Sequence, residues 1–345
     1  MTTLQQTELQ PAPAASQANP TAVFDTLSRY QQTMALKGAI DLGLFTAIAE
    51  GASTVEALAG RCQASERGIR ILCDFLTIQG FLCKATDRYE LTPESAAFLN
   101  RHSPAYLGDI AHYVVSPRMI ENFSDIATVV RTGRPLRNGC DGDDSARWVE
   151  FARRMSAAAE IGSRAAAPHL AQPGARQRVL DIAAGSGLYG IAIARLNPDA
   201  EIVAVDAEGV LEVAKENAIR AGVQERYRTL AGDALQLDLG GGYDLVLLTN
   251  FLHMFDAESN IQLMKKLRTA VKPGGRVAAV EFVPNEDRIS PPIPAAFSLV
   301  MLVNTEGGDA YTMRQLDGMF RKAGFGESHG RPIPPSPFTL VLAEA

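Results

Sequence analysis

The second half of the chain alternates apolar runs with segments of helical periodicity. Each apolar run is followed by a turn and then by a stretch in which apolar residues recur at helical spacing. This alternation predicts an α/β fold, a doubly wound and mostly parallel Rossmann-like sheet with helices on both faces. The predicted strands span 178–184, 201–206, 227–232, 243–249 and 276–283. A last apolar stretch, Phe338–Leu342, should pair antiparallel with a strand near 325–330.

The first part of the chain has a helical pattern followed by a short hairpin. Apolar positions recur at helical spacing over 24–49, and we expect Gly38 and Gly43 to break this segment into separate helices. The elements predicted next are capped helices at 53–60 and 65–79 and a hairpin with strands at 81–84 and 88–92. This order is typical of a winged helix.

These patterns predict the domain organisation. The predicted parts are a disordered tail (1–22), a winged-helix-like domain (23–105), a helical bridge (106–170) and the α/β domain (171–345). Within the bridge, glycine and proline predict loops at 133–135 and 139–144, before a helix that begins near Arg147.

A glycine-rich turn follows the first predicted strand of the α/β domain. Gly185, Gly187 and Gly190 have the spacing of a dinucleotide-binding turn, in which glycine lets the backbone approach a pyrophosphate at a helix N-terminus. Asp181 places a carboxylate beside this turn. That carboxylate does not favour a pyrophosphate, but it suits the ammonium group of a methionine-like ligand. The combination suggests S-adenosylmethionine.

Two further acids follow the next strands. Asp206 closes its strand and can accept hydrogen bonds from ribose hydroxyls, a feature that fits NAD equally well. Asp233, followed by Ala234, comes after the third strand and is placed to bind an adenine amino group. Acids at successive strand ends favour S-adenosylmethionine as the cofactor.

Charge and composition limit the classes of partner. The formal net charge of -6 argues against nucleic acid and anionic membranes, which require a basic surface. The 4 cysteines show no metal-ligand spacing. The N-terminal residues contain no signal-like segment, and no apolar stretch approaches the ~20 residues that span a bilayer. We expect a cytoplasmic protein that acts on a small, largely apolar molecule, without nucleic-acid or membrane partners.

The motif Asp181–Gly187 resembles that of the class I S-adenosylmethionine-dependent methyltransferases, specifically the two-domain O-methyltransferases of plant phenolic and bacterial secondary metabolism. The resemblance covers nearly everything after residue 24. Ala183 and Ala184 stand where family members often carry glycine, and we expect alanine to fit there. The resemblance implies that the winged-helix-like domain makes a homodimer and reaches into the partner's substrate pocket.

His253 is the candidate catalytic base. It lies directly after the strand 243–249, at the edge of the sheet where the cofactor is expected. In the resembled family a histidine on this loop deprotonates the acceptor hydroxyl and is oriented by an acid after the next strand, a position that Glu281 occupies. A carboxylate on one ring nitrogen would fix the tautomer. The alternative is that Glu281 only binds a backbone amide at the strand's end.

The chain departs from the family pattern beside both of these residues. Met254 and Phe255 stand where family members usually carry aspartate and tryptophan. A second orienting acid is expected in the loop 307–312, but the aligned residue is Ala310. The sequence leaves open whether the adjacent Asp309 takes that role.

The family also implies an acceptor pocket with an apolar wall. Phe151 and Met155, one turn apart on a helix predicted at 148–159, line that pocket in the resembled family, whereas on spacing alone core packing explains them equally well. Phe251 is expected to cover the adenine or sulfonium end of the cofactor. The remaining candidate wall residues are Phe297, Met301 and Asn304. Such a wall prefers a planar, poorly charged acceptor.

The function that these features favour is methylation of a hydroxyl on a small aromatic or polyketide-like metabolite. The change to Ala310 keeps a carbon methyltransferase, or a protein of this fold that binds the cofactor without methylating, as the alternative.

Two further classes are less favoured. A winged-helix regulator would bind DNA, but Arg61, Arg67 and Arg70 alternate with acids and form no basic stripe. A divalent ion could be held by His253 with Asp256 or Glu281, although no second histidine is paired with His253 in the sequence. We therefore predict no metal.

Overall fold

The computed structural model describes residues 19–137 and 145–345. The chain divides into two compact units, Met1–Ala96 and Ala97–Ala345. Most of the predicted N-terminal tail and the loop predicted at 139–144 lie outside the described residues. Within the described ranges, no helix is both long enough and apolar enough to cross a bilayer.

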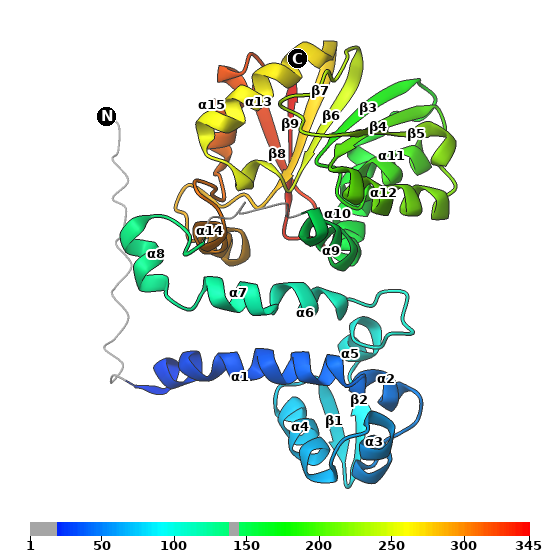
Figure 1. Cartoon of the computed structure of the whole chain (residues 1–345), viewed down its shortest axis with the longest axis vertical. Coiled ribbons are helices and arrows are strands. Elements are labelled where there is room, and N and C mark those ends of the chain that lie inside the picture. The colour runs from blue at the N-terminus through cyan, green and yellow to red at the C-terminus, as the bar shows by residue number, and fades with distance from the viewer. Residues whose placement is uncertain (1–18, 138–144) are drawn as a thin grey trace, which may run out of the picture. The chain divides into compact units, whose positions relative to one another are not determined.

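The first unit has the predicted winged-helix order of helices followed by a hairpin (Figure 1). Its elements are α1 (Thr21–Asp41), α2 (Leu44–Ala49), α3 (Val55–Cys62), α4 (Glu66–Ile78), β1 (Leu82–Ala85) and β2 (Arg88–Leu91). Thr54 and Ser65 cap α3 and α4 by accepting a backbone N–H three residues later. The buried Tyr89 of β2 donates its hydroxyl to Asp74 of α4 at 2.7 Å, which ties the hairpin to the helices.

The predicted helix break at Gly38 is wrong. α1 continues through Gly38 to Asp41, and the chain turns only at Gly43, which has a left-handed φ of 66°. Glycine inside a helix costs only about 1 kcal/mol relative to alanine. Burial of the neighbouring Ala39 and Ile40 offsets that cost, so the helix persists.

The second unit begins with short helices that follow α5 (Pro93–Phe98) and contain the predicted bridge. They are α6 (Asp109–Val114), α7 (Pro117–Asn122), α8 (Ile126–Thr132), α9 (Ser145–Arg154) and α10 (Ser156–Leu170). The single helix predicted at 148–159 is therefore divided at Met155. The Ser156 hydroxyl donates to the Ala152 carbonyl at 2.6 Å, and such a bond to the residue four positions earlier bends a helix.

A seven-stranded sheet forms the centre of this unit. Its strands are β3 (Gln177–Ile182), β4 (Ala200–Asp206), β5 (Tyr227–Ala231), β6 (Tyr243–Thr249), β7 (Val271–Glu281), β8 (Ser328–Pro332) and β9 (Thr339–Glu344). They lie in the order β5-β4-β3-β6-β7-β9-β8, and the pairs from β5 to β7 are all parallel. β9 is antiparallel to both β7 and β8, which confirms the pairing predicted for the last two strands.

Helices cover both faces of the sheet (Figure 1). α13 (Ala257–Ala270) and α15 (Met313–Lys322) lie on one face, and α11 (Leu188–Leu196) and α12 (Glu208–Arg220) lie with α10 on the other. The unit also contains α14 (Pro292–Asn304), which contacts α8, and the short 3₁₀ turns η1 (Gln224–Arg226) and η2 (Leu252–Met254). Leu180 and Ile182 pack in one core with α13 and α15, whereas Val179 packs in the other core with α10, α11 and α12. This alternation along one strand is what a sheet buried on both faces requires.

The strand order reverses at β3. β4 continues the sheet on one side of β3 and β6 on the other, although β4 and β5 separate β3 from β6 in the sequence. Ligands bind outside the carboxyl ends of the strands at such a switch point. The carboxyl ends of β5, β4, β3, β6 and β7 therefore form one continuous edge, and every predicted strand-end residue belongs to it.

Candidate functional site

The turn between β3 and α11 is tied to both of the adjacent strand-end acids. Gly185 and Gly187 have left-handed φ values of 55° and 75°, which glycine adopts without a steric cost. The Gly185 N–H donates to Asp206 Oδ2 at 2.9 Å, and the Gly190 N–H donates to Asp181 Oδ2 at 3.2 Å. The backbone thus holds both carboxylates beside the N-terminus of α11.

The two alanines of this turn differ in backbone conformation. Ala183 has a left-handed φ of 50°, a conformation that costs an alanine about 1–2 kcal/mol, whereas Ala184 has none of this strain. The side chain of alanine is accommodated at 183, but the backbone there is one that favours glycine.

Asp181 is the most constrained of the candidate cofactor residues. It is fully buried, and its Oδ1 atom has no hydrogen-bond partner among the described residues. Burial, with a smaller contribution from the Asp206 carboxylate, raises the pKa of Asp181 to about 7, against the Gly190 N–H that lowers it. A buried carboxylate oxygen with a free acceptor position fits a cationic group, and the ammonium of S-adenosylmethionine is such a group.

The other two acids are progressively more accessible. Burial raises the pKa of Asp206, whose oxygens accept N–H groups of Gly185 and Ala207. Asp233 is exposed, and its Oδ1 accepts the Leu235 N–H at 2.8 Å, which shapes the loop that includes Ala234. The three acids follow neighbouring strands β3, β4 and β5, so they line one part of the carboxyl edge.

His253 and Glu281 meet on the other side of the switch point. His253 lies on η2 directly after β6, and Glu281 is the last residue of β7. Their side chains are buried, with 2.6 Å between His253 Nδ1 and Glu281 Oε2. Glu281 Oε1 accepts the backbone N–H groups of Phe251 (2.8 Å) and Leu252 (2.7 Å). Glu281 therefore makes both of the contacts considered from the sequence. With Nδ1–H donating to the carboxylate, Nε2 remains an acceptor.

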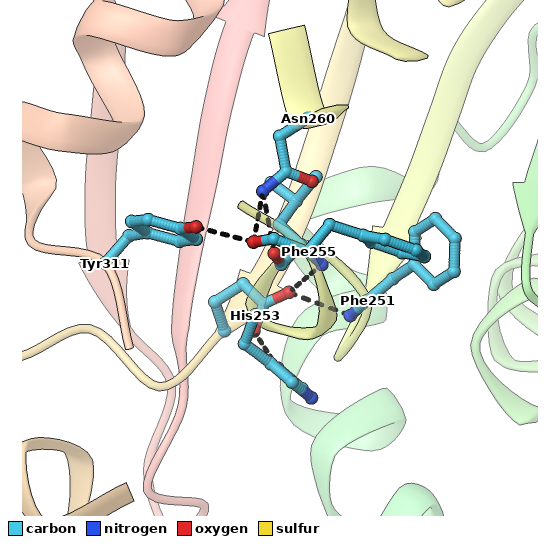
Figure 2. Close-up of polar contacts among 7 residues, drawn as sticks. Phe251, His253, Phe255, Asn260 and Tyr311 are labelled. Atoms are coloured by element: carbon cyan, nitrogen blue, oxygen red, sulfur yellow. Dashed lines mark hydrogen bonds and ion pairs between the residues drawn. The ribbon is translucent and has the colours of Figure 1, made fainter. Parts of the chain in front are cut away.

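The turn that carries His253 is also held on its carbonyl side. Asn260 of α13 donates to the Leu252 carbonyl at 2.8 Å and to the Phe255 carbonyl at 3.3 Å. The Tyr311 hydroxyl donates to the same Phe255 carbonyl at 2.5 Å. Figure 2 shows Asn260 and Tyr311 converging on this carbonyl, with the side chain of His253 extending away from them.

Aromatic rings form a continuous row beginning at His253. The imidazole meets Phe297 of α14 edge to face, with 5.0 Å between ring centroids. Phe297 stacks on Phe282 at 4.0 Å, and Phe282 meets Phe338 at 4.8 Å. Of the predicted wall residues, Phe297 is the one whose ring contacts the imidazole directly.

The other predicted wall residues lie on or beside the bridge helices. Phe151 of α9 contacts the rings of Tyr113 and Trp148, with centroids 4.9 and 5.7 Å away. Met155 marks the bend between α9 and α10. On α14, Met301 is buried and Asn304 accepts a 2.7 Å hydrogen bond from Asn122 of α7.

The position expected to hold a second orienting acid carries no acid function. Ala310 is fully buried. The adjacent Asp309 accepts a hydrogen bond from Arg288 Nη1 at 2.9 Å, and the same guanidinium donates to Gln315 at 2.7 Å. Glu281 is thus the carboxylate that the structure bonds to the His253 ring.

The described residues include no group of three or more His, Cys, Asp or Glu side chains placed to hold a metal ion. His253 is engaged by Glu281 through Nδ1. Asp256 instead caps α13 and accepts the Ser259 N–H at 2.8 Å.

Several residues of this site have no local signal in the sequence. Asn260 lies on an ordinary amphipathic helix, and Phe282 and Phe338 belong to separate segments that the sheet brings together. Tyr311 and Gly308 lie in the loop 307–312, where the family pattern has an acid that this chain lacks. That missing acid was the feature of the sequence that drew attention to this loop.

Comparison with protein families gives two matches along the chain. Residues 138–326 match the model of the O-methyltransferase domain, and residues 24–101 match that of the O-methyltransferase dimerisation domain. Together they cover most of both compact units.

Individual relatives extend over nearly the whole chain. A solved structure of a Nostoc punctiforme protein described as a candidate O-methyltransferase is 44% identical, with a TM-score of 0.91 over 96% of this chain and 100% of that one. The 3-hydroxy-5-methyl-1-naphthoate 3-O-methyltransferase of Streptomyces sahachiroi is 29% identical over 89% of this chain and 90% of its own length. The structure of PigF with SAH is 25% identical, with a TM-score of 0.83 over 95% of this chain and 100% of that one.

Proposed function

Because the chain belongs to the O-methyltransferase family, whose members depend on S-adenosylmethionine, we propose that it methylates a hydroxyl of a small aromatic or polyketide-like metabolite with His253 as general base. The observation that carries this proposal is the buried 2.6 Å contact between His253 Nδ1 and Glu281 Oε2 at the carboxyl edge of the sheet. It leaves Nε2 able to accept a proton close to the strand-end acids that bind the cofactor.

In the proposed mechanism, bound S-adenosylmethionine supplies an electrophilic methyl group. His253 Nε2 accepts the proton of the acceptor hydroxyl as the oxygen forms its new bond to carbon. Glu281 stabilises the resulting imidazolium through Nδ1–H and stays in place because two backbone N–H groups hold its other oxygen. The remaining contribution of the protein is positioning and exclusion of water.

The cofactor is assigned to the other half of the edge. Asp181 would bind its ammonium group, Asp206 its ribose hydroxyls, and Asp233 with Ala234 its adenine. Gly185 and Gly187 would let the backbone approach it, and Phe251 would cover it. The buried Asp181 oxygen, which has no hydrogen-bond partner in the described part of the chain, supports this assignment, because a cation placed there would stabilise the ionised carboxylate.

Aromatic rings beside the base support an aromatic acceptor. The Phe297 ring packs against the His253 imidazole and stacks on Phe282. These rings give the space beside the base an apolar wall, which suits a flat aromatic acceptor. We assign Phe151, Met155, Met301 and Asn304 to more distant parts of the same pocket. The naphthoate methyltransferase relative acts on an aromatic hydroxyl, in agreement with this choice.

The test is transfer from methyl-labelled S-adenosylmethionine to phenol, catechol, 2-naphthol, 3-hydroxy-1-naphthoate and an α-keto acid, followed by mass spectrometry. Wild-type protein should give a labelled ether, and His253→Gln should lower kcat by roughly 10²-fold or more. His329→Gln, which changes an exposed histidine on β8, should keep the wild-type rate. Label on carbon, or full activity in His253→Gln, would remove the proposed base.

We also infer that the protein is a homodimer, for which the dimerisation-domain match gives the general basis. Phe24, Leu27, Tyr30 and Met34 form a stripe along α1 and are between 47% and 68% exposed. A stripe of this kind on one face of a helix is suited to a second apolar surface. The cytoplasmic location stays a prediction.

A further inference from the structure

The loop 305–312 packs against the main chain of the turn that carries His253. The Gly308 N–H donates to Thr305 Oγ1 at 2.9 Å, which folds the loop back on itself. A Cβ atom added to Gly308 would overlap the His253 carbonyl oxygen and Thr305 Oγ1, and would lie 3.0 Å from the Met254 carbonyl carbon. Only a residue without a side chain permits this approach, although Gly308 does not have a left-handed φ.

Tyr311 continues the same contact three residues after Gly308, directly after the buried Ala310. Its side chain is buried, and burial is the main reason that the pKa of Tyr311 is raised to about 12, so it is a hydroxyl donor at neutral pH. That donor reaches the Phe255 carbonyl at 2.5 Å, where Asn260 also donates. Figure 2 shows Tyr311 and Asn260 on the side of the turn away from the His253 side chain.

The turn is therefore bonded on two opposed sides. Glu281 holds the amides of Phe251 and Leu252, and Asn260 with Tyr311 holds the carbonyls of Leu252 and Phe255. Position 310, where the family pattern has an acid, contributes only a buried methyl group.

We propose that Tyr311 and Gly308 are positioning residues that fix the His253 turn from its carbonyl side and so replace the second orienting acid. This inference rests on the proposed role of His253 as base. Neither residue touches the reacting atoms. Both act through the backbone, and loss of either should let the imidazole rotate away from Glu281. A displacement of about 1 Å at a catalytic group can lower a rate by up to roughly 10²-fold.

The decisive comparison is between Tyr311→Phe and Tyr243→Phe. Tyr243 is also buried, and its hydroxyl donates to the Leu239 carbonyl at 2.8 Å, at the opposite end of β6 from His253. Each variant loses one buried hydroxyl-to-carbonyl bond, so the two should have similar losses in melting temperature. Only Tyr311→Phe should lower kcat, by about tenfold, with an unchanged Kd for S-adenosylmethionine.

A second readout does not depend on the acceptor. The Nδ1 proton of His253, bonded to a buried carboxylate, should give a low-field proton resonance in ¹⁵N-histidine-labelled protein, identified by its absence in His253→Gln. Tyr311→Phe should broaden it through faster exchange with water, and Tyr243→Phe should leave it sharp. Gly308→Ala should act like Tyr311→Phe, whereas Gly318→Ala, whose added methyl meets nothing within 4 Å, should not.

The outcomes distinguish a failure of the proposed positioning role from a failure of the proposed function. If His253→Gln keeps the wild-type rate, the proposed base is wrong, and the resonance still decides whether Tyr311 holds the ring. If His253→Gln is inactive while Tyr311→Phe and Tyr243→Phe behave alike in rate and resonance, the positioning role is wrong. If Tyr311→Phe or Tyr243→Phe does not fold, Gly308→Ala and Gly318→Ala are compared in the same two measurements instead.

Discussion

If Asp181 binds the cofactor as proposed, it links the stability of the protein to its affinity for that cofactor. The pKa of Asp181 is about 7 in the folded chain and about 3.8 for an ordinary aspartate, so this acid binds its proton more tightly when the chain is folded. The cofactor-free protein therefore loses stability as the pH rises from about 3.8 to about 7, by up to roughly 4 kcal/mol, and loses no more at higher pH. A cationic ligand relieves this penalty because it binds the ionised form.

The first prediction concerns the pH dependence of cofactor binding. Affinity for S-adenosylmethionine should rise about tenfold between pH 6 and pH 8 and then level off, because binding must expel the Asp181 proton at low pH. Titration calorimetry in buffers of different ionisation enthalpy would measure both the affinity and the released proton. Affinity that is flat across this range, without proton release, would contradict the assigned role.

Asp181→Asn should separate binding from stability. The amide can still accept the Gly190 N–H but carries no charge to bury, so at pH 8 the cofactor-free variant should melt several degrees above wild type. This difference should shrink as the pH falls below 7 and vanish below about pH 3.8, where the wild-type carboxyl is neutral in both the folded and the unfolded chain. Detectable S-adenosylmethionine binding should be lost. If Asp181→Asn melts below wild type at pH 8, burial of the ionised carboxylate does not destabilise the cofactor-free protein.

Ala183 offers a smaller stabilisation in the same turn. Ala183→Gly should raise the free energy of unfolding by about 1 kcal/mol, because glycine adopts the left-handed φ of 50° without strain. Ala184→Gly, which removes a buried methyl from unstrained backbone, should lower it instead. Chemical denaturation of the two variants would distinguish them, and a shift of the same sign in both would refute the argument from φ.

At the scale of elements, the start of α11 depends on glycine for two separate reasons. Gly187 and Gly174 have similar φ values of 75° and 81°. A Cβ at Gly187 would also overlap the Tyr227 hydroxyl and lie 2.9 Å from the Ala214 methyl, whereas at Gly174 it would meet nothing within 4 Å. The two positions therefore separate backbone strain from steric exclusion.

Gly187→Ala should weaken S-adenosylmethionine binding by more than tenfold, since the turn must shift away from β5 and α12. Gly174→Ala should cost about 1 kcal/mol of stability, as expected for strain alone, and leave the Kd unchanged. Calorimetric titration beside thermal melts of each variant would measure both quantities. Equal loss of affinity in the two variants would mean that the turn responds to global stability only.

At the scale of the whole molecule, we expect the apolar stripe on α1 to form the dimer interface inferred above. Leu27→Glu places a charge at the centre of that stripe and should shift the protein to a monomer, because an unpaired charge would be buried in the interface. Ile219→Glu, at an exposed apolar position on α12, is the matched control and should stay dimeric. Light scattering coupled to size exclusion would measure both masses, and a dimeric Leu27→Glu protein would place the interface elsewhere.

Most of the fold followed from periodicity. The parallel strands, the antiparallel pair at the C-terminus and the winged-helix order were all predicted, because apolar spacing and turn residues act locally. Two helix boundaries did not follow from it: the break predicted at Gly38 is absent, and the break at Met155 was not predicted. Whether a helix continues through a glycine depends on how deeply the neighbouring residues are buried. The bend at Met155 depends on the hydrogen bond from the Ser156 hydroxyl to the Ala152 carbonyl. A hydrophobic pattern contains neither kind of information.

The sequence by itself determined which side chains stand at strand ends, and so it indicated Asp181, Asp206, His253 and Glu281 as candidates. Tertiary structure decided how they combine, because strand order places β3 between β4 and β6 and thereby puts the acids and the proposed base on one edge. It alone showed that Glu281 bonds the ring and the backbone together, and that Tyr311, Asn260 and Gly308 support the turn. Those contacts join segments far apart in the chain, and local pattern carries no information about which distant carbonyl a side chain will reach.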